Sequence, residues 1–295
     1  MRGGTFTRGV AVASLQILIS SFHVCVHAAQ IEGCPAAARG DSHDIAIVID
    51  SVELPEDAAL TPEIRAHLLG ELKSKSFHAS SSADSNWQNE IGQEVRVQLQ
   101  DQGYFKVLVD VASGLIRAEP SRLHYWVTVQ VESGLQYRLG EVRFENASMF
   151  TDRALRPEVP LREGDVFSAS AIREGLMRIT RLYGKHGYVD TAIEPQFSID
   201  SDVQRIDIVF RLDPGIQYRI GSVQVRGWSA AAERLVRSKF EFGQVFDATA
   251  LREFFEENKK VLPSGVIAEK SVAITRDPST GTVGIVFENR RCQTS

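Results

Sequence analysis

Apolar and polar residues alternate along several short stretches of the chain, and stretches with a helical period separate them. Between residues 137 and 145, Val142 and Phe144 alternate with charged neighbours, which predicts a strand with one buried face. After Ser168, which suits a helix N-cap, apolar residues recur at helical spacing at Ile172, Leu176, Ile179 and Tyr183. These patterns predict a strand followed by a helix that packs on it.

Two further strands follow this helix. Residues 189–199 and 206–212 alternate again, and the turn near Ser201 is short enough to make them antiparallel neighbours. Pro195 lies inside the first of them. Because proline cannot donate to a ladder, we expect this strand at the edge of its sheet.

A repeated motif shows that this unit is duplicated. The sequence Gln-Tyr-Arg-Leu-Gly at residues 136–140 returns as Gln-Tyr-Arg-Ile-Gly at residues 217–221, so Tyr137 and Tyr218 are 81 residues apart. Further along, Gly-Asp-Val-Phe at 164–167 returns as Gly-Gln-Val-Phe at 243–246. A period near 80 is too long for a solenoid repeat and indicates duplicated domains.

Glycines at the ends of the long helices reveal a third, diverged copy upstream. Gly103, Gly187 and Gly265 each follow a bulky apolar residue by four positions, as expected where a left-handed residue closes a helix. In the first copy the pattern predicts strands at 45–53, 106–111 and 124–131, helices at 61–73 and 86–102, and a mobile Ser-rich loop at 74–85. In the last copy it predicts strands at 218–226, 267–275 and 282–287, and helices at 233–237 and 247–261.

The chain is therefore expected to be an α+β protein of three tandem β-α-α-β-β domains, each a three-stranded mixed sheet covered by two helices. The expected boundaries are 44–134, 135–214 and 215–289, with a linker at 30–43 and a tail at 290–295.

The first 29 residues read as an export signal. Arg2 and Arg8 precede a short apolar stretch, and residues 26–28 suit cleavage. Cleavage, lipidation at Cys34 and retention as an anchor remain alternatives. The chain carries 33 basic and 38 acidic residues, a formal charge of −5, which disfavours nucleic acid as a partner.

No catalytic, cofactor or metal motif stands out in the sequence. The histidines outside the signal lack metal-site spacing, and neither paired cysteines, a nucleophile elbow nor a phosphate-binding glycine loop is present. We therefore predict no enzyme activity, no cofactor and no metal site.

The motif residues of these repeats resemble those of a known family. The unit that opens with Tyr137 and Gly140, and whose helix runs through Tyr183 into Gly187 and Tyr188, resembles the polypeptide-transport-associated (POTRA) domain. Equivalent motif positions in the last copy are Tyr218, Gly221 and Gly265. Tandem units of this kind are similar to the periplasmic arm of BamA-type outer-membrane assembly factors.

The resemblance implies a function in the envelope of a Gram-negative-type bacterium. It implies a periplasmic, chaperone-like scaffold, associated with the outer membrane through its partners. Those partners would be unfolded outer-membrane proteins, an assembly-type β-barrel protein or other envelope proteins. Only eight residues follow Phe287, so we expect this chain to lack the C-terminal transmembrane barrel of that family. The alternative is an inner-membrane-anchored docking protein for cell division or secretion.

Strand addition at exposed sheet edges is the binding mode we expect, because main-chain hydrogen bonds tolerate many client sequences. The residues assigned to this role are Val189, Thr191, Ile193, Val272 and Ile274. Trp228, in the loop after the last copy's first strand, is expected either to contact a partner or to cap its own core.

Overall fold

A computed structural model describes residues 45–57, 59–79, 86–266 and 268–288. The expected signal, the linker, Cys34 and the tail lie outside these residues. The described part of the chain forms two compact units, one of residues 45–183 with 190–215, the other of residues 184–189 with 216–288. Among the described residues, no helix has the length and apolar character needed to cross a membrane.

The first sheet has four strands in the order β2-β1-β4-β3. Its elements are β1 (Ile45–Glu53), α1 (Pro62–Ser74), β2 (Phe77–Ala79), α2 (Asn86–Asp101), β3 (Leu108–Glu119) and β4 (Arg122–Glu132). β1 pairs with β4 in parallel, and β3 pairs with β4 antiparallel. The fourth strand corrects the three-stranded expectation, because part of the predicted Ser-rich loop forms β2, with Phe77 and Ala79 buried.

The second sheet has the expected three strands in the order β5-β7-β6. Its elements are β5 (Arg138–Glu145), α3 (Asp152–Leu155), the short 3-10 helix η1 (Arg156–Glu158), α4 (Ala169–Lys185), β6 (Ala192–Asp200) and β7 (Arg205–Asp213). Ser168 caps α4, since its Oγ accepts a hydrogen bond from the Ala171 N–H at 3.1 Å. Of the predicted stripe on α4, Ile172, Ile179 and Tyr183 are buried, and Leu176 is half-buried.

The third sheet repeats this plan in the order β8-β10-β9. Its elements are β8 (Arg219–Arg226), α5 (Ala230–Lys239), α6 (Ala250–Glu257), α7 (Ala268–Ser271), β9 (Val272–Asp277) and β10 (Thr282–Glu288). The predicted long helix at 247–261 is shorter than expected, because Asn258 ends α6 by donating its side-chain amide to the Phe254 carbonyl at 2.9 Å. Val261, expected to face inward, is 45% exposed, and Leu262 is buried instead.

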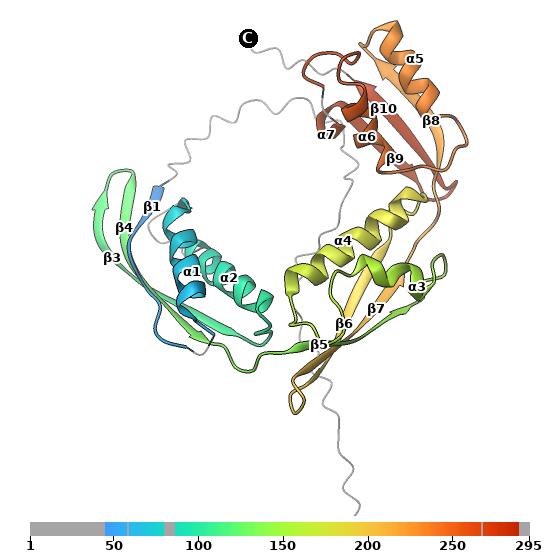
Figure 1. The fold of residues 1–295 in the computed structure, drawn as a ribbon. Helices are drawn as coiled ribbons and strands as arrows, with labels where there is room; N and C mark the ends of the chain where they lie inside the picture. The colour runs from blue at the N-terminus through green and yellow to red at the C-terminus, as the bar shows by residue number, and fades with distance from the viewer. Residues whose placement is uncertain (1–44, 58, 80–85, 267, 289–295) are drawn as a thin grey trace, which may run out of the picture. The chain divides into compact units, whose positions relative to one another are not determined.

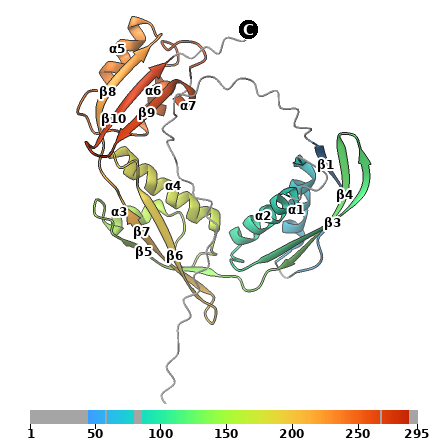
Figure 2. The same ribbon diagram turned by 180° about the vertical axis from the view of Figure 1, so that it is seen from behind.

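Helices cover a single face of each sheet, and the strands run beneath them (Figures 1 and 2). α1 and α2 lie on the first sheet, α3 and α4 on the second, and α5 and α6 on the third (Figure 1). The apolar cores of the first and third sheets lie between the two layers.

The motif residues lie at the junctions between elements. Gly103 and Gly187 follow α2 and α4 by two residues and have φ angles of 89° and 86°, in the left-handed region that glycine adopts freely. The Gly103 carbonyl accepts the Tyr137 N–H at 2.8 Å, and the Gly187 carbonyl accepts the Tyr218 N–H at 2.9 Å. The repeated Gln-Tyr-Arg motif therefore marks where the end of one helix meets the start of the next repeat's first strand. Gly265 lies instead in a turn eight residues beyond α6.

Gly140 and Gly221 mark an irregularity shared by β5 and β8. The register of each strand shifts by one residue at this point, which is a β-bulge. A Cβ at Gly140 would lie 2.0 Å from the Asp207 carboxylate, which accepts a hydrogen bond from the Glu141 N–H at 2.7 Å. A side chain at this position would have to displace the side chains of Asp207 and Arg205, so glycine keeps the Glu141–Asp207 hydrogen bond undisturbed.

Candidate partner-binding edges

The candidate site is the set of outer strands, whose main-chain groups are available for pairing. Each sheet has a central strand between two outer ones, with β4 and β1 both internal in the first sheet. Figure 2 shows β6, β9 and β3 as outer strands of their own sheets. A strand in this position leaves every second N–H and C=O without a ladder partner.

Pro195 identifies which groups of β6 point outward. It pairs with Phe210 of β7 in a register without interruption from Ala192 to Asp200. Because proline has no N–H to donate to β7, its main chain must face away from the sheet. Hydrogen-bonding direction alternates along a strand, so Ile193, Phe197 and Ile199 also face outward. The side chains of these residues are half-buried, and most of their neighbours in β6 are exposed.

β6 is therefore an outer strand whose row of outward N–H groups is interrupted at Pro195. The sequence correctly placed Pro195 at an edge. The same proline, however, removes the outward N–H between those of Ile193 and Phe197. Proline at an exposed edge is a device that natural sheets use against further pairing. We infer that β6 is the poorest of the three edges for adding a strand.

Two residues assigned to this edge lie outside it. Val189 and Thr191 precede β6, which begins at Ala192. Val189 packs against the apolar core beneath the third sheet, and the Thr191 hydroxyl donates to the Pro214 carbonyl at 3.2 Å. The alternation of Val189 and Thr191 that predicted a strand therefore belongs to the turn before β6. Ile193 is the one residue of this group that lies within β6.

β9 is an uninterrupted edge. Val272 and Ile274 pack toward the core of the third sheet, as Ile193 and Phe197 do in the second. By the alternation that Pro195 reveals in β6, their main-chain groups face away from β10. No proline lies between Val272 and Asp277, so successive outward donors are present. Binding through these residues stays a prediction.

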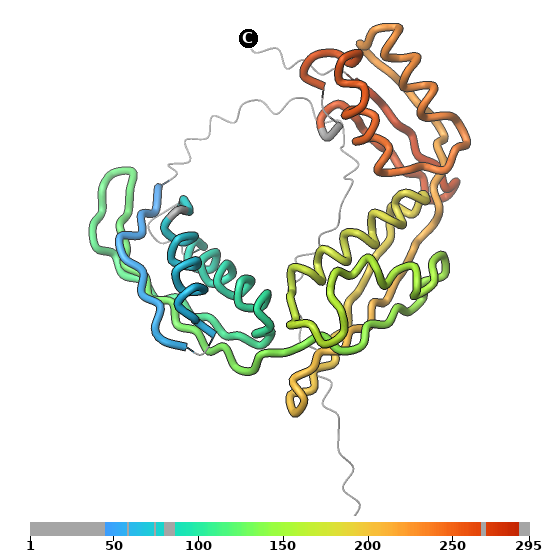
Figure 3. Tube along the Cα trace, in the orientation of Figure 1, coloured from blue at the N-terminus to red at the C-terminus, as the bar shows by residue number. Residues whose placement is uncertain are grey.

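β3 is the longest outer strand, and the alternation in the sequence predicted only its first part. It runs over 12 residues where the pattern predicted six, and Figure 3 traces it with β4 as a long hairpin. Three large apolar side chains on it are more than half exposed: Leu108 at 64%, and Leu115 and Ile116 at 53% each. The signal that could have located it is the apolar pair Leu115-Ile116 beyond Gly114.

The opposite outer strands, β5 and β8, are covered over their first halves. In β5, the Leu139 N–H donates to the Asp165 carbonyl at 2.9 Å, and the Leu139 carbonyl accepts the Gly164 N–H at 2.8 Å. In β8, Ile220 makes the equivalent pair of bonds with Gln244 and Gly243, at 2.8 and 2.7 Å. The repeated Gly-x-Val-Phe motif thus acts as an edge cover. Beyond the bulge, the second half of each strand extends past this cover.

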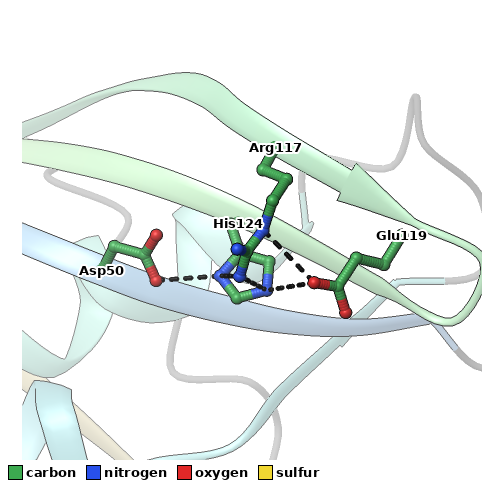
Figure 4. Close-up of polar contacts among 4 residues, drawn as sticks. All are labelled: Asp50, Arg117, Glu119 and His124. Atoms are coloured by element: carbon green, nitrogen blue, oxygen red, sulfur yellow. Dashed lines mark hydrogen bonds and ion pairs between the residues drawn. The ribbon is translucent and has the colours of Figure 1, made fainter.

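A polar cluster crosses the open face of the first sheet and joins three of its strands (Figure 4). His124 of β4 is 8% exposed, and its Nδ1 lies 2.9 Å from the Asp50 Oδ1 of β1. Its Nε2 lies 3.1 Å from the Arg117 Nη2 of β3, and Arg117 also pairs with Glu119 at 3.2 Å. An imidazole that donates to Asp50 and accepts from Arg117 uses both ring nitrogens. We interpret the cluster as a brace across the sheet.

Trp126 lies beside this cluster and covers a glycine. It pairs with Gly114 across β3 and β4, and a Cβ at Gly114 would lie 2.3 Å from the indole Nε1. Cross-strand aromatic cover of a glycine supports a strand that lacks a side chain of its own. Trp228, in contrast, packs against Phe255 and Phe287 with ring centroids 6.0 and 5.5 Å apart, so it caps its own core.

Hydrogen bonds to Asp57 tie the loop after β1 to the end of β4. Its carboxylate accepts the Ala59 N–H at 2.8 Å and the Ser133 N–H at 3.3 Å. Desolvation opposes ionisation, but these bonds and the Ser133 side chain outweigh it and lower the pKa of Asp57. Among the described residues, no group of three or more His, Cys, Asp or Glu side chains is placed to hold a metal ion.

Comparisons with known proteins agree with this architecture. Residues 137–215 match the family model described as POTRA, surface antigen variable number repeat. The outer membrane protein assembly factor BamA of Neorickettsia risticii (strain Illinois) is 22% identical over 109 residues, which are 37% of this chain and 15% of that protein. The crystal structure of POTRA3-5 of Haemophilus influenzae BamA matches with a TM-score of 0.62 and 16% identity, and covers 84% of this chain and 98% of that one.

These matches bear out the resemblance seen in the motifs. The second repeat corresponds to the POTRA model over its whole length, and three successive β/α modules match a tandem of POTRA domains. The chain is thus similar to the POTRA region of BamA-type proteins, and the aligned part spans about one seventh of the length of the BamA protein that it matches.

Proposed function

We propose that this chain is a periplasmic scaffold for outer-membrane protein assembly, which holds extended client or partner segments by adding them as strands to β9 and β3. Support comes from its likeness to POTRA domains of an outer-membrane protein assembly factor. The expected clients are unfolded outer-membrane proteins, and an assembly-type β-barrel protein is the expected partner. Its role is binding, with no catalytic step.

The observation that carries this proposal is that two outer strands, β9 and the part of β3 before its irregularity between Leu115 and Arg117, contain no proline. β9 offers main-chain groups at Val272 and Ile274, and β3 offers them at Val109 and Val111, without a proline in either strand. An unfolded chain destined for a β-barrel is rich in segments that favour extended backbone. Pairing through main-chain bonds lets one edge accept many such sequences.

Proline substitution tests this mode without removing the sheet. Ile274→Pro and Val111→Pro each delete one outward N–H, and the ladder to β10 or β4 keeps its own donors. Each side chain packs against a core, so Ile274→Ala and Val111→Ala are the matched controls for lost packing.

The probe is a urea-denatured outer-membrane β-barrel protein diluted into the purified mature chain, with complex formation followed by fluorescence anisotropy. The double proline variant should bind at least about fivefold more weakly than the double alanine variant, since two lost hydrogen bonds are worth about 1–3 kcal/mol together. Equal binding by the two folded variants would show that clients do not add to these edges.

A further inference from the structure

The third module differs from the second at one turn beside β8. The offset that aligns Gly164 with Gly243 places Phe242 at the position of Glu163. Phe242 is 83% exposed, more than any other large apolar side chain in the described residues. A single exposed apolar residue is common on protein surfaces, so Phe242 becomes informative only together with the pocket and the strand edge beside it.

The turn that carries Phe242 is fixed by hydrogen bonds. The Gly243 N–H donates to the Ile220 carbonyl at 2.7 Å, and the Gly243 carbonyl accepts Nη1 of Arg219 at 2.9 Å. The Glu241 N–H donates to the Gln244 side chain at 3.2 Å. The backbone that carries Phe242 is therefore held beside β8, and its ring extends into solvent.

A shallow pocket of about 260 Å³ adjoins the ring. β8 contributes Ser222 and Val223, α5 and its end contribute Arg237 and Phe240, and the turn contributes Glu241 and Phe242. Phe240 is 4% exposed, so Phe242 is the exposed aromatic residue of this lining, and Ser222 and Val223 belong to the part of β8 beyond the Gly-x-Val-Phe cover. Val223 and Val225 pack toward the core, so by the alternation seen in the outer strands their main-chain groups face outward.

The surroundings of this pocket are basic, in contrast to the same region of the second module. Residues 216–243 contain five basic and two acidic residues, a net charge of +3, within a chain whose net charge is −5. Residues 135–164 contain five of each and are neutral. Arg226 lies at the end of β8, and Arg234, Arg237 and Lys239 lie on α5. Arg237 lines the pocket together with Glu241 and also pairs with Glu233 at 2.9 Å.

We infer that β8 and the Phe242 pocket form a second docking site, specific to the third module, for an extended acidic segment of a partner protein that inserts one apolar side chain. The segment pairs with the main chain at Val223 and Val225. Its apolar side chain lies against Phe242, and its carboxylates lie near Arg226 and the basic side of α5. This site is on the opposite edge from β9 and does not depend on strand addition there.

A synthetic peptide tests the inference directly. The probe is a fluorescent heptapeptide, Asp-Val-Asp-Phe-Asp-Val-Asp, and the control replaces each Asp by Lys. The acidic peptide should bind the purified mature chain, shift the amide signals of Val223 and Val225, and release as salt is raised. The basic peptide should not bind.

Phe242→Glu, which installs the residue of the second module, should weaken binding by about tenfold or more, because it removes the apolar contact and adds a negative charge. Glu163→Phe, the reciprocal change in the neutral module, should create no comparable site. Phe242 is exposed, so the variant keeps its fold, which its melting temperature can verify.

Three results would overturn the inference: unchanged affinity in Phe242→Glu, equal affinity for the basic peptide, or amide shifts confined to β9. The Ile274→Pro variant separates this site from the proposed client edge. If that variant loses the denatured barrel protein but keeps the acidic peptide, both sites stand. If the acidic peptide binds and the barrel protein does not, only the proposed client-binding function fails.

Discussion

At the scale of single residues, the carboxylate of Asp57 links the two ends of the first module. It holds the loop after β1 against the end of β4 through two main-chain N–H groups. Because these bonds favour the ionised form, the folded-state pKa of Asp57 lies below its ordinary value. The stabilisation is therefore complete above the unfolded pKa near ~3.9 and disappears as the pH falls through the folded pKa.

Asp57→Asn should remove this part of the acid sensitivity. The amide oxygen still accepts one of the two bonds, so the variant should be less stable than the natural chain at pH 7 and closer to it at pH 3. Urea unfolding at both pH values, followed by circular dichroism, measures the difference. A stability gap that stayed the same at pH 7 and pH 3 would show that Asp57 does not contribute through its charge.

At the scale of elements, the three outer strands are chemically different although they share one place in the fold. β6 has a proline in its middle, β9 is short and continuous, and β3 is long and carries exposed Leu115 and Ile116. Under the proposed function, the edge of the second module is protected by its proline, and β9 and β3 are the expected pairing edges. Selectivity among partners can arise from strand chemistry without any change of fold.

Pro195→Val should convert β6 into a binding edge. The substitution restores an outward N–H between those of Ile193 and Phe197 and keeps a β-branched side chain in the strand. In analytical ultracentrifugation, we expect the variant to self-associate more strongly than the natural chain at the same high concentration.

Gln196→Val is the matched control. It adds the same side chain one position along, where the main chain faces β7 and no outward donor is gained. Equal association of the two variants would attribute the effect to added apolar surface and would contradict the role given to the proline.

The sequence was a good guide to elements with strong periodicity and a poor guide to their ends. Regular alternation located β1, β7 and the edge position of β6, and helical spacing located α4 and its cap. β3 was underestimated because Ser113 and Gly114 break its alternation, although Trp126 covers the glycine from the next strand. Contacts between strands supply what local propensity lacks there.

The candidate site depended even more on tertiary structure. Val189 looks like a strand residue in sequence but packs against the third core, and the tight turn of Phe242 becomes notable only once its exposure is known. Main-chain groups can pair with a partner only on an outermost strand, and the order of strands in the sheet decides which strand is outermost. Pro195 was the one residue whose covalent chemistry predicted an outermost strand from the sequence.

At the scale of the whole molecule, the first and second modules share packing. Phe105, just after α2, is 4% exposed and lies 5.0 Å from Phe167 and 5.4 Å from Phe197 between ring centroids. Asp101, at the end of α2, accepts the Ser170 N–H at 2.7 Å at the start of α4. Such a joint should make the two modules unfold together.

Gly103→Ala should uncouple them. The residue has a φ of 89°, and a Cβ would lie 2.9 Å from the Tyr137 carbonyl oxygen and 2.8 Å from Val166 Cγ1. We expect a loss of about 2–4 kcal/mol, the sum of left-handed strain and the clash, and two unfolding steps in place of one.

Gly134→Ala separates strain from contact. Its φ is 66°, but nothing lies within 4 Å of its Cβ position, so it should cost only about 1–2 kcal/mol and leave a single transition. Guanidinium titration measures both variants. If both cost the same and both retain one transition, the contact at Gly103 does not couple the modules.

The placement of the tryptophans gives the chain a built-in optical readout. Trp87 is buried in the first core, Trp126 lies on the open face of that sheet, and Trp228 belongs to the third module, while residues 135–214 contain none. Trp228→Phe would restrict emission to the first module, and Phe at both other positions would restrict it to the third. Quenching and spectral shifts can then report which end of the chain a bound strand has reached, without an attached dye.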